Sequence, residues 1–134
     1  MDIKNTLYVA AQKARNQAYA PYSNFKVGAA IYADNSQIYT GCNVENISFP
    51  CGTCAEQSAI SSMITQGGKQ IMQILIIADG ENLITPCGAC LQRIAEFSNA
   101  QTLIHLASLK GIQKSLTISD LLPHRFVAKE LKND

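Results

Sequence analysis

The sequence predicts an α/β fold in which helices cover both faces of one β-sheet. The main observation is the order of the segments along the chain, which is helix, two strands, helix, strand, helix, strand, strand. Strands that alternate with helices are typical of this architecture. The second observation is size. The chain has 134 residues, of which 47% are hydrophobic, so we expect one domain with one core over residues 1–134.

The first part of the chain is expected to form a helix and a hairpin. Apolar residues recur every three or four positions in residues 3–19, which indicates an amphipathic helix, and Pro21 ends it. Two strands are predicted at residues 26–33 and 37–44. Asp34-Asn35-Ser36 joins them and has the composition of a hairpin turn.

The middle of the chain is expected to form two helices around a buried strand. Residues 54–66 are predicted to be helical up to Gly67-Gly68. Residues 71–78 are apolar on both faces, as in a central strand that is covered on two sides. Pro86 precedes a predicted helix at residues 87–98. The remaining elements are a loop at 45–53, strands at 102–107 and 112–116, a helical turn at 119–122 and a helix at 127–132.

Composition and charge exclude several classes of function. Eleven basic and ten acidic residues give a net charge of +1, without the basic stripe of a nucleic-acid or membrane-surface binder, so we expect a small-molecule partner. No apolar run is long enough for a membrane span, and no signal core is apparent, which predicts a cytoplasmic protein. Five cysteines in a reducing compartment are expected to be ligands, catalytic thiols or core residues rather than disulfides. His105 lies in an apolar strand and is expected to be a hydrogen-bonded core residue.

Two short segments carry the residues of a metal site, Cys54-Ala55-Glu56 and Pro86-Cys87-Gly88-Ala89-Cys90. Cys87 and Cys90 are three residues apart, so they face the same way in the first turn of a helix. Both segments lie at predicted helix starts, whose partial positive charge favours thiolates. A catalytic zinc site has three protein ligands and one water. Because Glu56 lies close enough to take a proton from that water, the set predicts a hydrolytic zinc site.

A second assignment of the cysteines is also compatible with the sequence. Cys51-Gly52-Thr53-Cys54 and Cys87-Gly88-Ala89-Cys90 make two CxxC pairs, as in a four-cysteine structural zinc site, and a redox dithiol is a further alternative. The structural site would leave Glu56 without a role. We therefore favour the three-thiolate site, with Cys42 and Cys51 as small, partly buried thiols.

The cysteine segments match the pattern of zinc-dependent deaminases, in which a His or Cys and a nearby Glu precede Pro-Cys-x-x-Cys. Over nearly its whole length the chain resembles the short, homotetrameric cytidine deaminases. The residues that carry this resemblance outside the two cysteine segments are Tyr19-Ala20-Pro21-Tyr22-Ser23-Asn24-Phe25, Val27-Gly28-Ala29-Ala30, Gly41-Cys42-Asn43-Val44-Glu45-Asn46, Leu91-Gln92, Leu121-Leu122-Pro123 and Phe126.

The resemblance implies a fold, an activity and an assembly. The fold would be a three-layer α/β/α arrangement around a five-stranded mixed sheet. The activity would be the zinc-dependent hydrolysis of cytidine and 2′-deoxycytidine to uridine and 2′-deoxyuridine with release of ammonia, in pyrimidine salvage. The assembly would be a homotetramer with one zinc ion in each subunit.

The resemblance also implies roles for individual residues. Cys54, Cys87 and Cys90 would hold zinc, and Glu56 would be the proton shuttle. The remaining site residues would contact the substrate. Asn43 and Glu45 would bind the ribose, and the backbone around Ala55 would bind the edge of the base. Phe25 and the Phe126 of a neighbouring subunit would line the pyrimidine and ribose pocket, and Phe49 would contact the substrate from a position at a subunit interface.

Two departures from the family pattern concern charge. Gln57 and Leu91 stand where many relatives have arginine, directly after Cys-Ala-Glu and after the second cysteine of Pro-Cys-x-x-Cys. Three thiolates on a divalent zinc leave an excess charge of −1, which arginine offsets through charged hydrogen bonds. We therefore expect a more electron-rich zinc, a bound water of higher pKa and activity shifted to higher pH.

Two other functions are compatible with the sequence. An aminopyrimidine nucleoside antibiotic, as in blasticidin-S deaminase, would use the same chemistry, although Asn43 and Glu45 favour an ordinary ribose. A zinc-stabilised binding protein without turnover would use four cysteine ligands, including Cys51.

Overall fold

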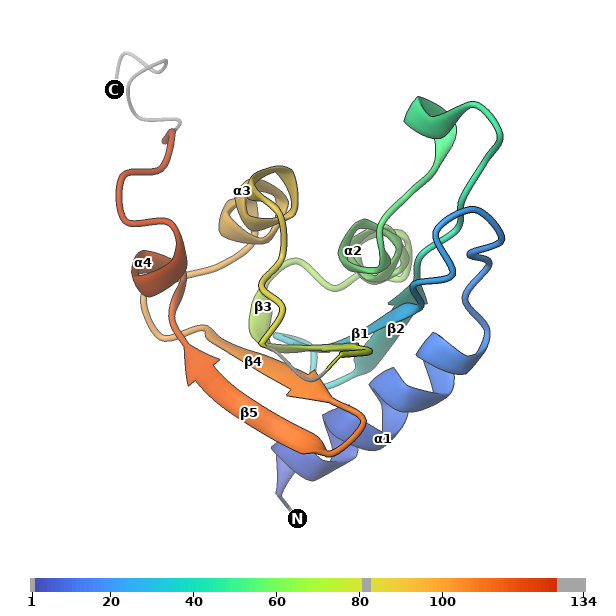
Figure 1. Cartoon of the computed structure of the whole chain (residues 1–134). Helices are drawn as coiled ribbons and strands as arrows, with labels where there is room; N and C mark the ends of the chain where they lie inside the picture. The colour runs from blue at the N-terminus through green and yellow to red at the C-terminus, as the bar shows by residue number, and fades with distance from the viewer. Residues whose placement is uncertain (1, 81–82, 128–134) are drawn as a thin grey trace.

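The computed structural model describes residues 2–80 and 83–127, and within them the strands form a five-stranded sheet (Figure 1). The strands are β1 (Val27–Ala33), β2 (Ile38–Cys42), β3 (Ile71–Ala78), β4 (Leu103–Ser108) and β5 (Gly111–Leu116). The helices are α1 (Ile3–Asn16), the 3₁₀ turn η1 (Phe49–Cys51), α2 (Ala55–Thr65), α3 (Gly88–Glu96) and α4 (Ile118–Leu121).

The sheet is mixed, as expected. Its strand order is β2-β1-β3-β4-β5, with β1 antiparallel to both of its neighbours, β3 parallel to β4, and β5 antiparallel to β4. The predicted strand at residues 71–78 is confirmed at both ends. It lies at the centre of the sheet because its side chains are apolar on both faces.

Helices cover both faces of the sheet, which gives the predicted three layers. Helix α1 packs on one face, against β1 and β3, while α2 packs on the other face and contacts α3 (Figure 1). The apolar side chains accordingly form two clusters. Ile74 of β3 is buried beneath α2, whereas the next residue, Leu75, is buried with Leu7 and Ala11 of α1.

Two glycines let the helices approach the sheet closely. A Cβ atom at Gly28 would lie 2.1 Å from the carbonyl oxygen of Ala11 in α1. A Cβ atom at Gly41 would lie 2.4 Å from the backbone nitrogen of Ala59 in α2. Both distances are far below van der Waals contact. Gly41 therefore sets the height of α2 above β2, and with it the position of the cysteine segment at the start of α2.

Some element boundaries differ from those predicted. Helix α1 ends at Asn16 rather than at residue 19, because Tyr19 pairs with Val44 instead of continuing the helix. The predicted loop at 45–53 contains the short turn η1. The helix predicted at 127–132 lies outside the described residues, apart from Val127, which is not helical. No helix within the described ranges is long and apolar enough to cross a membrane.

Candidate active site

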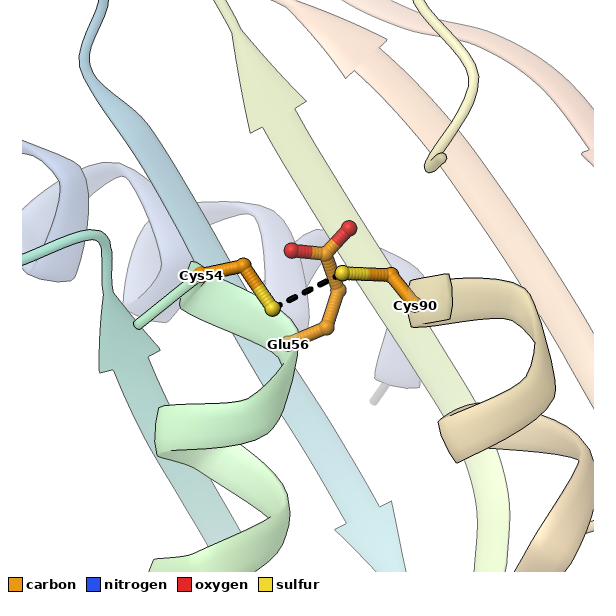
Figure 2. Close-up of side chains that lie close together, drawn as sticks. All are labelled: Cys54, Glu56 and Cys90. Atoms are coloured by element: carbon orange, nitrogen blue, oxygen red, sulfur yellow. Dashed lines mark hydrogen bonds between the residues drawn. The ribbon is translucent and has the colours of Figure 1, made fainter. Parts of the chain in front are cut away.

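The starts of α2 and α3 bring two thiols together. Cys54 is the N-cap of α2, where its sulfur accepts a hydrogen bond from the backbone N–H of Gln57 at 3.4 Å. Cys90 lies in the first turn of α3 and is buried. Its thiol donates to the Cys54 sulfur at an Sγ–Sγ distance of 2.7 Å (Figure 2). The prediction that these two segments meet is therefore confirmed for Cys54 and Cys90.

The hydrogen bond between the two thiols shifts their pKa values in opposite directions. The hydrogen bond from Cys90 is the main cause that lowers the pKa of Cys54 to about 6. The same bond, together with burial, raises the pKa of Cys90. Cys54 is therefore the more readily deprotonated thiol of the pair, and binding of a metal ion between the sulfurs would release the thiol protons.

Glu56 lies beside the two sulfurs. Its side chain rises from the first turn of α2 toward Cys90 and is 5% exposed (Figure 2). One oxygen of Glu56 and the sulfurs of Cys54 and Cys90 all lie within 4.8 Å of one another. Burial is the main cause that raises the pKa of Glu56 to about 7. A carboxyl group with this pKa can both take and give a proton near neutral pH.

Cys87 lies near this group but outside it. It is the N-cap of α3 and its side chain is exposed. Its sulfur is not among the atoms that lie within 4.8 Å of one another, although Cys87 lines the same cavity as Cys54, Glu56 and Cys90. The chemistry of the donors fits zinc, because soft thiolates at helix N-termini are typical zinc ligands.

Two cavities open at this end of the sheet. The smaller, of about 230 Å³, is lined by the three cysteines and Glu56 and also by three predicted substrate residues, Phe25, Asn43 and Ala55. The larger, of about 490 Å³, is lined by Asn43 and Cys54 together with Glu45, Phe49 and Tyr22, among others. Because Asn43 and Cys54 line both, the cavities are adjacent.

Asn43 and Glu45 are each held in place by hydrogen bonds to nearby residues of the chain. The Asn43 side chain accepts from the N–H of Val27 at 2.9 Å and donates to the carbonyl oxygen of Phe25 at 2.8 Å. The Glu45 carboxylate accepts from the N–H groups of Tyr22 and Ser23 and from the Ser23 hydroxyl. These bonds lower the pKa of Glu45, with the Ser23 hydroxyl as the largest cause.

Each of these two side chains retains hydrogen-bonding capacity. A carboxylate has about four acceptor positions, of which Glu45 uses three, and a primary amide has two N–H donors, of which Asn43 uses one. Both groups line the larger cavity and are available to a polar ligand there.

Phe126 lies apart from both cavities within the chain. It lines a separate hollow with Gln92 and Arg125, and its carbonyl oxygen accepts from the Gln92 side chain at 3.1 Å. Its own side chain is 63% exposed. The structure of one chain therefore places Phe25, Asn43, Glu45, Phe49 and Ala55 around the candidate site but does not bring Phe126 there.

The other cysteines and His105 lie outside the thiol group. Cys51 is exposed on η1, where its sulfur donates to the Ser48 hydroxyl at 3.5 Å. The prediction of a partly buried thiol is confirmed for Cys42 and wrong for Cys51, because η1 holds Cys51 at the surface. His105 is fully buried and hydrogen-bonded to Gln73 and Ser115, as predicted.

A cation lies beside the thiols even though positions 57 and 91 carry no charge. The Nη1 atom of Arg93 lies 3.8 Å from the sulfurs of both Cys54 and Cys90. Gln57 and Leu91 directly follow Glu56 and Cys90, whereas Arg93 does not adjoin a motif residue. The sequence signal for Arg93 is its spacing of three residues from Cys90, which puts both on one face of α3. The premise of the expected shift to higher pH therefore no longer holds.

Comparison with known proteins identifies the family of the chain. A family model described as "Cytidine and deoxycytidylate deaminase zinc-binding region" matches residues 1–106. A cytidine deaminase of Sporosarcina psychrophila is 41% identical over 131 residues, which cover 98% of this chain and 96% of that protein. Another, of Halalkalibacterium halodurans, is 36% identical over 130 residues, covering 97% and 98%.

Solved structures give the same result. The crystal structure of cytidine deaminase from Burkholderia pseudomallei matches with a TM-score of 0.86 and 38% sequence identity, covering 91% of this chain and 98% of that one. That of the Mycobacterium tuberculosis enzyme matches with a TM-score of 0.78 and 33% identity, covering 92% and 96%. Because the sequence match and the fold extend over nearly the whole chain, the protein belongs to the zinc-binding cytidine and deoxycytidylate deaminase family.

Proposed function

We propose that this protein hydrolyses cytidine and 2′-deoxycytidine to uridine and 2′-deoxyuridine, with release of ammonia, in pyrimidine salvage. The observation that carries the proposal is the buried Glu56 carboxyl group beside the sulfurs of Cys54 and Cys90, on the wall of a cavity. The relatives named as cytidine deaminases support the choice of substrate.

We propose that residues 1–134 form a single domain. Within it, the proposed zinc ligands are Cys54, Cys87 and Cys90. Cys54 and Cys90 are already close together, and Cys87 lines the same cavity. When bound, zinc supplies a water whose pKa is lowered to about 7. Three protein ligands would be the number typical of a catalytic zinc site that also binds a water.

Glu56 moves the protons of the reaction. Its carboxylate accepts one proton from the attacking water and delivers it to ring nitrogen N3, which makes C4 of the pyrimidine more electrophilic. The oxygen bonds to C4. Glu56 then passes the second proton to the amine as the C4–N bond breaks, so that cytidine and water give uridine and ammonia.

Asn43 and Glu45 are the proposed ribose contacts. Each lines the larger cavity, next to the thiols, and each has one hydrogen-bonding position left. Phe25 and the backbone at Ala55 line the smaller cavity, which would hold the base. The sugar hydroxyls would thus lie in the larger cavity while C4 faces Glu56.

The substrate assignment predicts a strong dependence on the sugar. Cytidine and 2′-deoxycytidine should be deaminated, whereas free cytosine should have a kcat/KM lower by about 10- to 100-fold. Loss of one hydrogen bond to the charged Glu45 carboxylate accounts for this range, since such a bond contributes about 1.5–3 kcal/mol. The measurement is ultraviolet absorbance and ammonia release, with zinc content determined on the same sample.

The same assay separates the alternatives. Preference for a blasticidin-S-like nucleoside over cytidine would contradict the proposed substrate but keep the chemistry. A protein that contains zinc and releases ammonia from no nucleoside would be a binding protein, and the proposed function would be wrong.

A homotetramer is the proposed assembly. Several large apolar side chains around the site and near the C-terminus are exposed in the single chain, among them Ile47 (77%), Phe49 (72%) and Phe126 (63%). Contact between copies would bury them, and it would let the Phe126 of one subunit reach the cavity of another. A cytoplasmic location is also proposed, because three thiol ligands need a reducing compartment and all five cysteines are free.

Phe126 should act on the site of a neighbouring subunit. Phe126→Ala should raise KM by about 10- to 100-fold, since full burial of a Phe side chain contributes about 1.5–3 kcal/mol. Mixing Phe126→Ala with Glu56→Ala subunits should restore activity, because mixed oligomers pair an intact Glu56 with an intact Phe126. Sedimentation at the assay concentration should give four times the chain mass of 14.5 kDa. An active monomer, or mixtures no better than their components, would contradict the proposal.

A further inference from the structure

Arg93 lies beside the sulfurs of Cys54 and Cys90, and the proposed reaction assigns it no role. Its Nη1 atom is 3.8 Å from the sulfur of Cys54 and 3.8 Å from that of Cys90. One guanidinium group therefore spans the start of α2 and the first turn of α3.

The helix geometry explains how Arg93 reaches both sulfurs. It lies in α3, three residues after Cys90, on the same face. Helical side chains lean toward the N-terminus, so a long side chain at position 93 extends back over Cys90. Because α2 packs against α3, the guanidinium also meets the sulfur at the N-cap of α2.

The side chains of Gln57 and Leu91, which directly follow Glu56 and Cys90, make contacts away from the sulfurs. The side-chain nitrogen of Gln57 donates to the Ser61 hydroxyl at 2.9 Å, one turn further along α2 and away from the sulfurs. Leu91 is 7% exposed and belongs to the core beneath the helices. A charged side chain at 91 would have to leave that core, whereas one at 93 lies at the surface over the sulfurs.

The charge of the proposed zinc group calls for such a partner. Three thiolates with one divalent zinc carry a net charge of −1, and hydrogen bonds from a cation to the sulfurs stabilise that charge. Arginine presents several N–H donors in a rigid planar group, so it can contact two sulfurs at once. The sulfurs in turn raise the pKa of Arg93, mainly through the hydrogen bond to Cys90.

We propose that Arg93 is a positioning residue that holds the sulfurs of Cys54 and Cys90 together and offsets the excess negative charge of the zinc–thiolate group. This inference rests on the proposed zinc ligands. Arg93 would supply the positive charge that Gln57 and Leu91 lack in this chain.

The test is the strength of zinc binding, which is independent of turnover. Residues that support metal ligands typically contribute about 10- to 100-fold to metal affinity or activity. Arg93→Gln should therefore release zinc to an excess of a chromogenic chelator about 10- to 100-fold faster than wild type. Arg93→Lys should recover much of the loss, and Gln57→Arg should restore zinc retention in the Arg93→Gln background by supplying a cation from α2.

A matched control removes one positive charge away from the site. Lys13→Gln lies on α1, on the opposite face of the sheet, and should release zinc at the wild-type rate. Substitution with cobalt(II) gives a second readout, because Arg93→Gln should shift the thiolate-to-metal charge-transfer band while Lys13→Gln should not. The melting temperature of the metal-free variants checks that the fold is intact.

Three results would overturn the inference. They are a release rate for Arg93→Gln within about twofold of wild type, an equal loss in Lys13→Gln, and a loss that neither Arg93→Lys nor Gln57→Arg reverses. The last would mean that the side chain of Arg93 acts through packing rather than charge. If wild type binds zinc but deaminates nothing, the proposed function fails while the release rates still decide the role of Arg93.

Discussion

Replacing Glu56 by Gln should abolish most turnover while leaving the zinc content at the wild-type level. Glutamine keeps the size of the side chain but cannot carry the proton to N3 or to the departing amine. A positioned acid–base group contributes about 10²- to 10⁴-fold, so kcat should fall by at least about a hundredfold. The loss should appear in kcat more than in KM, because the proton is transferred in the transition state. Steady-state kinetics with metal analysis on the same sample measures both.

Because Glu56 is buried, replacing it by Gln should change catalysis without disturbing the fold. Its side chain is 5% exposed and lies between two helix starts, so the uncharged amide should cost little stability there, and the thermal unfolding temperature should confirm an intact fold. A variant that turns over within tenfold of wild type would rule out Glu56 as the proton carrier. A variant that loses zinc together with activity would instead indicate that the carboxylate is a ligand.

The fold was predictable where the sequence pattern and the packing agree. The strand at 71–78 is apolar on both faces and lies at the centre of the sheet with the predicted ends. The first helix was predicted three residues too long, because its helical period continues to Ala18 while Tyr19 pairs with Val44. A pairing between residues so far apart in sequence leaves no local signal, so periodicity alone cannot place that boundary.

The site was predictable as far as its residues follow one another in short motifs. Cys54, Glu56 and Cys90 were assigned from spacing, and the structure brings them together. Arg93 was missed because its contact with Cys54 joins two helices whose packing the sequence does not state. Phe126 shows a further limit, since a side chain that is 63% exposed in one chain acquires its proposed role only in an assembly.

Cys87 and Cys51 offer the sharpest test of the zinc site, because both are exposed thiols in CxxC pairs and only Cys87 is a proposed ligand. Cys87→Ser should lose zinc on dialysis and with it all activity, since two thiolates hold zinc far more weakly than three. Cys51→Ser should keep the full zinc content, because the Cys51 sulfur contacts Ser48 on η1 and does not line the cavity of the other thiols.

Zinc binding should also bring the Cys87 sulfur close to the sulfurs of Cys54 and Cys90. Cys87 is the N-cap of α3, one turn from Cys90, and lines the same cavity, so we expect its side chain to turn toward the bound metal. In the zinc-loaded protein, Cys87 should therefore be protected from alkylation while Cys51 still reacts, and removal of zinc should expose Cys87 again. Mass spectrometry of the alkylated chain measures both sites in one sample. Protection of Cys51, or loss of zinc from Cys51→Ser, would favour four cysteine ligands, which would leave no coordination position for a reacting water and would contradict a catalytic site.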